Sequence, residues 1–386
     1  MKIGIVTHYY KSVNYGGNLQ AYALCKVLEN MGHQPEQLQI DWAGSHRNLL
    51  NRQQPGLKQR LKNLARPVVY ALIPRYRKKW QASKATRQRL EAAFAHFNRQ
   101  LIPHSQVVYT PKTIGRAVAH YDAFITGSDQ VWNPIWYFPP FFLDFVPSHV
   151  PKFSYSASIG QSCLPQEVQE RYRKHLQDFI GVSVREADAV TLLDGKAECV
   201  LDPTMLLTKE QWLAVAEKPQ LESPYAFCYF LGNDPEERRL AKQYAAQKGL
   251  TLVNIPNATG LQHSNDLDFG DVQLDDPSPE AFLGLVAGAA QVFTDSFHAT
   301  VFSLLFQRQF LAFPREGQGS SRITTLLGIF DAADRFQEAP EKLRVSDLEA
   351  LPEMRYETLP ERFSQAANSS REYLLTTLEK AKEMLP

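Results

Sequence analysis

The chain has 386 residues with 44% hydrophobic and 22% charged side chains, which is typical of a globular protein large enough for two domains. No run approaches the roughly 18 apolar residues of a membrane span, and the apolar start from Met1 to Thr7 lacks the regions of a signal peptide. Four separated cysteines without a CxxC pair exclude a disulfide framework, so we expect a cytoplasmic protein. The net charge is only +1, and we expect no binding of nucleic acid.

The first 40 residues predict a strand, a loop, a helix and a second strand. Lys2–Thr7 is an apolar run, and a polar loop follows through Asn14-Tyr15-Gly16-Gly17. Apolar residues then recur at helical spacing between residues 20 and 31, and Gly32 is a stop signal. Gln37–Ile40 is the next strand. This order is typical of the opening of a doubly wound parallel sheet.

A basic segment interrupts the alternation between residues 43 and 100. From Ala43 to Leu90 there are 13 Lys and Arg residues and no Asp or Glu, whereas the rest of the chain has 29 basic and 41 acidic residues. Apolar residues at helical spacing predict helices broken at prolines. Because basic amphipathic helices bind anionic bilayers, one hypothesis is peripheral membrane contact through residues 43–90. The alternative is a solvated helical insert that packs on the N-terminal domain.

Alternation of strands and helices resumes near residue 121. Thr208 and Gln211 form a capping box before one of the predicted helices. We predict an α/β protein with two Rossmann-like domains facing across a cleft: residues 1–205, with the basic helical insert 43–100, and residues 206–345, followed by a C-terminal helical tail, 346–386. The predicted strands are Tyr121–Thr126, Lys152–Ser156, Gly181–Val184, Glu198–Leu201, Tyr225–Leu231, Leu250–Ile255, Gln291–Thr294 and Phe310–Phe313.

The usual cofactor fingerprints are missing from the sequence. The glycines Gly16-Gly17 are not part of a GxGxxG motif, and there is no GxxxxGK[ST] phosphate loop. Ten histidines show no HExxH or other metal-ligand spacing. Asp266-Leu267-Asp268 has the DxD form of a metal–nucleotide site, but such triplets occur by chance. We therefore expect no metal and no cofactor.

A polar cluster follows the predicted strand Tyr121–Thr126, at the carboxyl end where open α/β sheets bind ligands. Small residues there, such as Gly127, allow backbone amides to approach a ligand, and Ser128, Asp129 and Gln130 supply donors and acceptors. The structural alternative is a capped turn around a core tryptophan.

Arg185 leaves the end of a predicted buried strand just before a helix, which directs its guanidinium towards the cleft. The fork geometry of arginine suits a carboxylate or a phosphate. The alternative is a structural ion pair with Glu186 or Asp188.

The sequence from Thr294 to Thr300 joins a strand to an apolar helix and carries the most informative cluster. Ser296 is a natural N-cap, and His298 falls in the first helical turn, where free N–H groups and the helix dipole favour an anion. The same field disfavours the imidazolium, so a neutral His298 can accept a proton near pH 7. Ser321 and Arg322 open another helix after the following strand and place a second guanidinium near the same cleft.

Six groups of residues, in this order, resemble the polysaccharide pyruvyl transferase family. They run from residue 3 to about 327, and the basic insert and the region after residue 330 lie outside the resemblance. One departure is Ala299, where the family usually has glycine. The matching residues are Asn14-Tyr15-Gly16-Gly17 with Leu19-Gln20-Ala21-Tyr22-Ala23-Leu24, Gly127-Ser128-Asp129-Gln130-Val131-Trp132-Asn133, Ser183-Val184-Arg185-Glu186, Leu201-Asp202-Pro203-Thr204, Asp295-Ser296-Phe297-His298 and Ser321-Arg322.

The resemblance implies a fold like that of GT-B glycosyltransferases, closed by a C-terminal helix. It also implies phosphoenolpyruvate as the donor and a hexose or N-acetylhexosamine of a bacterial surface polysaccharide, or of its polyprenyl-pyrophosphate-linked precursor, as the acceptor. The implied product is a pyruvate ketal. This chemistry holds two anionic groups and moves protons, but it needs neither a metal nor a nucleotide.

On this basis His298 and Arg185 are expected to be catalytic. His298 is expected to act as the general acid–base group, and Arg185 and Arg322 are expected to bind the phosphate and carboxylate of the donor. Two alternatives stay open: a nucleotide-sugar glycosyltransferase of the same architecture, and a non-catalytic scaffold in polysaccharide assembly. The other expected substrate-binding residues are Ser296 and Ser321 near the donor, and Asn14, Gly16, Gly17, Gly127, Ser128, Asp129 and Gln130 on the acceptor side or the cleft floor.

Overall fold

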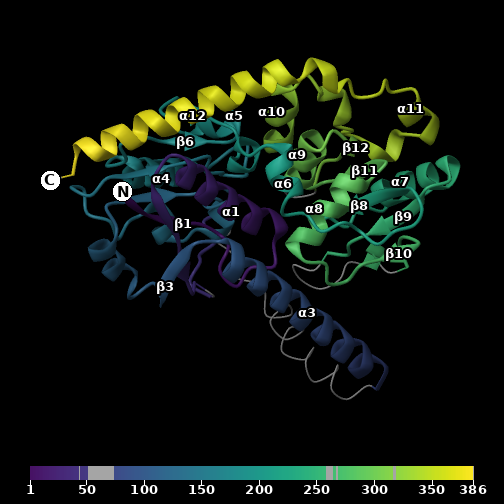
Figure 1. Ribbon diagram of the computed structural model, residues 1–386, viewed down its shortest axis with the longest axis horizontal. Coiled ribbons are helices and arrows are strands. Elements are labelled where there is room, and N and C mark those ends of the chain that lie inside the picture. The colour runs from purple at the N-terminus through teal and green to yellow at the C-terminus, as the bar shows by residue number, and fades with distance from the viewer. Residues whose placement is uncertain (43, 51–73, 258–263, 267, 316–318, 386) are drawn as a thin grey trace.

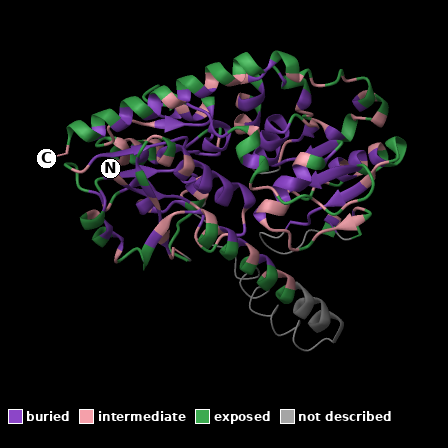
Figure 2. Ribbon diagram, viewed as in Figure 1, coloured by how far each residue is buried: buried purple, intermediate pink, exposed green. Residues whose placement is uncertain are grey.

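The computed structural model describes residues 1–42, 44–50, 74–257, 264–266, 268–315 and 319–385. Two parallel sheets, each covered by helices, lie side by side (Figure 1). Figure 2 shows that the strands of both sheets are largely buried. The predicted α/β class with two Rossmann-like sheets is therefore confirmed.

The N-terminal sheet has the strand order β3-β2-β1-β4-β5, and all neighbours are parallel. This is the order of a doubly wound sheet, in which the carboxyl ends of the central strands form the ligand edge. The strands are β1 (Lys2–Val6), β2 (Gln34–Ile40), β3 (His104–Tyr109), β4 (Ala123–Thr126) and β5 (Lys152–Ser154), and a two-stranded parallel extension follows in β6 (Ser183–Val184) and β7 (Glu198–Cys199).

The C-terminal sheet repeats this arrangement with the order β10-β9-β8-β11-β12. Again every described pair is parallel, so the carboxyl ends of β8 and β11 lie at one edge. The elements are β8 (Tyr225–Tyr229), α7 (Pro235–Lys248), β9 (Thr251–Asn254), β10 (Val272–Gln273), α8 (Pro279–Gly288), β11 (Gln291–Thr294), α9 (Phe297–Leu305), β12 (Gln309–Ala312) and α10 (Ser321–Ile329).

Helix α1 (Tyr15–Asn30) lies between the two sheets and is buried on nearly every side. The Tyr15 ring stacks on Phe282 of α8 with centroids 4.5 Å apart, and its hydroxyl donates to the Pro277 carbonyl at 2.8 Å. Tyr22 packs on Trp212. A helix that is buried on most of its faces is stabilised mainly by tertiary packing of this kind. These contacts bring the first turn of α1 up to the C-terminal sheet.

The tail helix α12 (Pro360–Glu383) runs back along the molecule and joins the two halves (Figure 1). Tyr373 donates a hydrogen bond to the Ser154 carbonyl at 2.9 Å, and the Leu201 amide donates to the Ser370 hydroxyl at 2.9 Å. Other helices in the described part of the chain are α4 (Gln166–Leu176), α5 (Ala187–Leu192), α6 (Lys209–Leu213) and α11 (Val345–Glu349).

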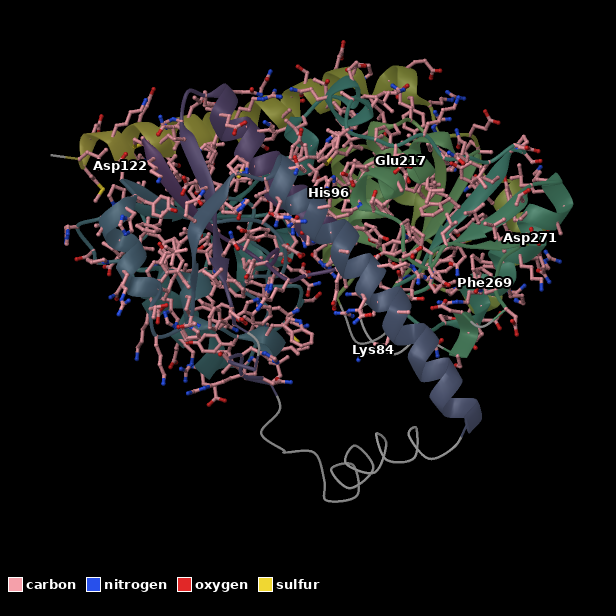
Figure 3. The ribbon with its side chains drawn as sticks, turned by 60° about the horizontal axis from the view of Figure 1, so that its bottom comes forward. Lys84, His96, Asp122, Glu217, Phe269 and Asp271 are labelled. Carbon is pink, nitrogen blue, oxygen red and sulfur yellow. The ribbon has the colours of Figure 1, made fainter. Side chains whose placement is uncertain are left out.

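Part of the predicted basic insert is the long helix α3 (Pro74–Leu101), which starts at one of the prolines expected to break the helices. The second half of α3 packs on the N-terminal half of the molecule through Leu90, Phe94 and Phe97. The first half of the helix protrudes from the molecule, and in Figure 3 Lys84 accordingly lies further out along the helix than His96. Residues 51–73, which carry 5 of the 13 Lys and Arg residues between Ala43 and Leu90, lie outside the described residues. Membrane contact through residues 43–90 stays a prediction. Within the described part of the chain, no helix is long and apolar enough to span a bilayer.

Candidate active site

Two helix N-termini meet where the two sheets approach each other. Asn14 caps α1 by accepting a hydrogen bond from the Gly17 amide at 3.0 Å, and Ser296 caps α9 by accepting from the Ala299 amide at 3.4 Å. The capping role predicted for Ser296 is confirmed. Each helix directs its remaining amides and the positive end of its dipole into this region, which favours anions.

His298 lies in the first turn of α9, directly against α1. A Cβ on Gly16 would stand 2.5 Å from Cγ and Cε1 of His298 and closer still to Nδ1, so only glycine leaves room for the imidazole. The Asn14–Gly17 segment, which was expected on the acceptor side or the cleft floor, thus contacts the histidine motif directly. His298 itself is 6% exposed.

Asp202 is the centre of a buried polar cluster on the other side of His298. One of its carboxylate oxygens, Oδ2, accepts from the Ser128 hydroxyl at 2.7 Å and from Arg185 at 2.9 Å. His298 Nε2 lies 3.5 Å from the same oxygen, an ion-pair distance rather than a short hydrogen bond. The other oxygen accepts two hydrogen bonds from Thr204.

Arg185 is held inward by two carboxylates. One guanidinium nitrogen bonds Asp202, and the other bonds Asp129 at 3.2 Å. Its Cζ lies 4.4 Å from the ring centre of Phe297, and the side chain is only 1% exposed. Arg185 therefore forms an ion pair, but with Asp129 and Asp202 rather than with Glu186 or Asp188. Its predicted role on the donor stays untested.

The cluster keeps both aspartates ionised. Burial alone raises the pKa of Asp202, but the charges of His298 and Arg185 and the hydrogen bonds to the carboxylate lower it well below the usual range. For Asp129 burial again acts upwards, and Arg185, His298 and His8 together bring the pKa below its ordinary value. A carboxylate thus faces His298 Nε2 at any pH at which the protein is expected to work.

Three guanidinium groups gather near these carboxylates. Burial lowers the pKa of Arg322 to about 9, and repulsion from Arg185 and Arg315 adds to this effect. Arg322 lies in the first turn of α10. Arg315 follows β12 and packs near Gly232, which lies in the loop after β8. Arginines that repel one another in a buried place gain stability when an anion binds between them.

A cavity of about 790 Å³ opens beside the cluster and takes walls from both halves of the molecule. That volume is in the range of small-molecule sites. The cleft predicted between the two domains therefore contains a real pocket. The residues that line it include His8, Asn14, Trp42, Asp129, Gln130, Trp136 and Arg315.

Aromatic rings form one wall of this cavity. The His8 ring lies 4.9 Å from Trp42 and 4.3 Å from Phe141, measured between centroids. His46 bridges Trp42 and Trp136 at 5.6 and 5.5 Å. Trp136 is 41% exposed, which is high for so large an apolar side chain. Such a wall offers flat apolar faces to a ligand.

Most of the predicted site residues come together, but not all of them face the cavity. Asn14, Asp129 and Gln130 line it. Ser128 is fully buried on Asp202. Gly127 packs in the core, where an added Cβ would stand 3.3 Å from Ile5, so its smallness serves the sheet. Ser321 is the first residue of α10.

The first aspartate of the DxD triplet is accounted for by packing, whereas Asp268 is exposed. Asp266 is 1% exposed and pairs with Arg238 at 2.6 Å. Leu267 lies outside the described residues. Among the residues that the structure does describe, there is no group of three or more His, Cys, Asp or Glu side chains that could hold a metal ion.

Sequence reasoning missed three contributors to the site. His8 and Arg315 each follow a strand, β1 and β12, at the ligand edge of their sheets, so the rule that pointed to Arg185 also applies to them. Asp202 was visible only as part of a family motif. Its importance depends on contacts with residues far away in the sequence.

Comparisons with known proteins decide the family. The sequence model of polysaccharide pyruvyl transferases matches residues 14–317. The chain belongs to this family. The comparison with curated protein sequences gave no match.

Solved structures show the fold. UDP-N-acetylglucosamine 2-epimerase from Rickettsia bellii is 9% identical with a TM-score of 0.56, covering 99% of this chain and 97% of that one. The UDP-GlcNAc 2-epimerase from Methanocaldococcus jannaschii, in complex with UDP-GlcNAc and UDP, is 11% identical with a TM-score of 0.51, covering 92% and 94%. At these identities the likeness concerns the fold alone, which is the predicted GT-B-like arrangement.

Proposed function

We propose that this pyruvyl transferase takes its pyruvyl group from phosphoenolpyruvate and places it as a ketal on two hydroxyls of a hexose or N-acetylhexosamine. The acceptor would belong to a bacterial surface polysaccharide or to its lipid-linked precursor. Family membership supports the transfer to a saccharide. The observation that carries the donor assignment is the grouping of Arg185, Arg315 and Arg322 beside the His298–Asp202 pair.

The donor carries a phosphate and a carboxylate, and the arginine cluster matches both. Arg315 and Arg322 suit the phosphate and carboxylate through their fork geometry. Ser296 and Ser321, at the N-termini of α9 and α10, add hydroxyl and amide donors. Arg185, already bonded by Asp129 and Asp202, contributes its positive charge and holds those carboxylates in place. Because guanidinium groups supply the charge, we propose a reaction without metal or cofactor.

His298 is proposed to protonate the donor. Asp202 faces Nε2, so Nδ1, on the side kept open by Gly16, exchanges a proton with the substrate. Protonation of the methylene carbon of phosphoenolpyruvate generates a cationic C2, and one sugar hydroxyl adds to it. The C–O bond to phosphate then breaks, and a second hydroxyl closes the ketal. Overall, phosphoenolpyruvate and a diol give the ketal and hydrogen phosphate.

The acceptor is proposed to enter the 790 Å³ cavity from the side of Trp42 and Trp136. The apolar C–H face of a pyranose packs on aromatic rings, while its hydroxyls turn to polar groups. Asn14, Asp129 and Gln130 provide such groups in the lining of the cavity. A lipid-linked acceptor would also give the basic segment 43–90 a purpose, since docking on an anionic bilayer would bring the enzyme to its substrate.

The test is incubation of the full chain with phosphoenolpyruvate labelled with ¹³C at the methylene carbon and a set of methyl glycosides of hexoses and N-acetylhexosamines. We expect one phosphate released for each labelled pyruvyl group found on sugar, both with and without EDTA. A glycosyltransferase would instead consume a nucleotide-sugar such as UDP-GlcNAc. Release of UDP without incorporation of the label would overturn the proposal.

A further inference from the structure

His8 lies directly after β1 and borders the acceptor cavity. Its Nε2 lies 3.2 Å from the Gln130 carbonyl oxygen. A carbonyl oxygen can only accept, so the ring hydrogen is on Nε2. Together with the packing on Trp42 and Phe141, this bond holds the imidazole in one orientation and one tautomer.

In that tautomer the lone pair is on Nδ1. None of the described residues forms a hydrogen bond with Nδ1, and this atom is accessible from the cavity that His8 lines. Burial lowers the pKa of His8 below its ordinary value, and the charge of His46 acts in the same direction. Asp129 and the Gln130 carbonyl act in the opposite direction, but burial is the largest effect. The ring is therefore neutral near pH 7, and the lone pair is available as a base.

His8 and His298 are both close enough to one carboxylate for their charges to act on it. The charges of both histidines act on Asp129, whose other partner is Arg185. A Cβ on Gly17 would stand 2.6 Å from the His8 carbonyl oxygen and 3.3 Å from Asp129 Oδ2, which shows how closely β1, α1 and the loop after β4 approach. His298 is on the Asp202 side of this group, and His8 is on the cavity side.

We propose that His8 Nδ1 is the base that removes the proton from the attacking saccharide hydroxyl, an assignment that rests on the proposed function. In the first step the hydroxyl oxygen forms its bond to C2 of the donor, its proton passes to Nδ1, and the methylene carbon takes a proton from His298. The imidazolium returns its proton to water through the cavity. In the second step the phosphate leaves with the C–O electron pair and takes up a proton from water as hydrogen phosphate, and the second hydroxyl gives its proton to His8 Nδ1. His298 regains its proton from water, so the cycle closes.

The test compares His8→Gln and His8→Ala with the wild-type chain, with phosphoenolpyruvate and the methyl glycoside on which the wild type turns over fastest. Glutamine keeps a donor for the Gln130 carbonyl but offers no base. We expect kcat to fall about 10²-fold or more in both variants with KM for phosphoenolpyruvate unchanged. We also expect the acidic limb of the kcat–pH profile to disappear, and added imidazole to restore part of the activity of His8→Ala.

The matched control is His104→Gln, because His104 on β3 also bonds a carbonyl, that of Ile102, but lies outside this cavity. It should keep wild-type kcat. If His8→Gln keeps wild-type kcat and only His8→Ala is impaired, without imidazole rescue, the ring is structural and the proposal is wrong. A wild-type chain that releases phosphate with none of the glycosides contradicts the proposed function, and the His8 assignment fails with it.

Discussion

Gly16→Ala is the sharpest single test of the site geometry. The added Cβ would stand 2.5 Å from two carbons of the His298 ring, whereas ordinary contacts between such atoms are about 3.5 Å. Because Nδ1 would stand closer still, the imidazole must retreat by at least about 1 Å and lose its position next to Asp202. A displacement of that size costs about 10²-fold in rate when the displaced group does the chemistry. The methyl group also covers Nδ1, the atom proposed to exchange the proton.

The fold should tolerate this change, because Gly16 is in the first turn of α1 and alanine favours helices. We expect kcat for phosphate release to fall about 10²-fold while the midpoint of thermal unfolding moves by only a few degrees. Gly328→Ala is the control: it is also a helical glycine, in α10, and no described atom lies within 4 Å of its Cβ. Wild-type turnover in Gly16→Ala would refute the placement of His298 in the reaction.

Three further predictions concern charged residues in and near the site. Asp202→Asn leaves Arg185 with one carboxylate and should lower the free energy of unfolding at pH 7 by about 3 kcal/mol, so an unchanged urea midpoint would contradict the ion-pair account. Arg315→Ala should raise KM for phosphoenolpyruvate at least about 10-fold, since a buried anion loses its partner, and a normal KM would remove Arg315 from the donor site. Burial raises the pKa of Glu237 to about 9, and the nearby charges of Asp295 and Asp234 act in the same direction. Because the pKa in the unfolded chain is about 4.5, folding stability falls as the pH rises from about 4.5 to 9. Glu237→Gln removes this titrating group and should raise Tm at pH 8 by about 2 °C or more. Glu236→Gln, at a half-buried ion pair with Arg239, should not raise Tm.

The sequence predicts the fold well where apolar runs are buried. The central strands β1, β4, β8 and β11 are close to their predicted ranges. Two edge strands, β5 and β12, are also close to their predicted ranges, whereas the edge strands β3 and β10 were missed. The edge strand β3 was missed because it exposes Val107 and Val108 and carries polar residues, so it shows neither a buried run nor a clean alternation.

The site is partly predictable for a related reason. Position at a strand end identified His298 and Arg185, and the N-cap pattern identified Ser296. The direction of the Arg185 side chain was not predictable, because it depends on Asp202, which folds onto it from another segment. Likewise, Gly16 in a loop motif gives no sign that a histidine from the other half of the molecule packs on it.

The central claim, that phosphoenolpyruvate is the donor, is tested most directly by calorimetric titration of the full chain with phosphoenolpyruvate in the presence of EDTA. We predict saturable binding by the wild type that weakens at least about 10-fold in Arg322→Ala, and no binding of UDP-GlcNAc under the same conditions. Binding of UDP-GlcNAc with no heat from phosphoenolpyruvate would contradict the account.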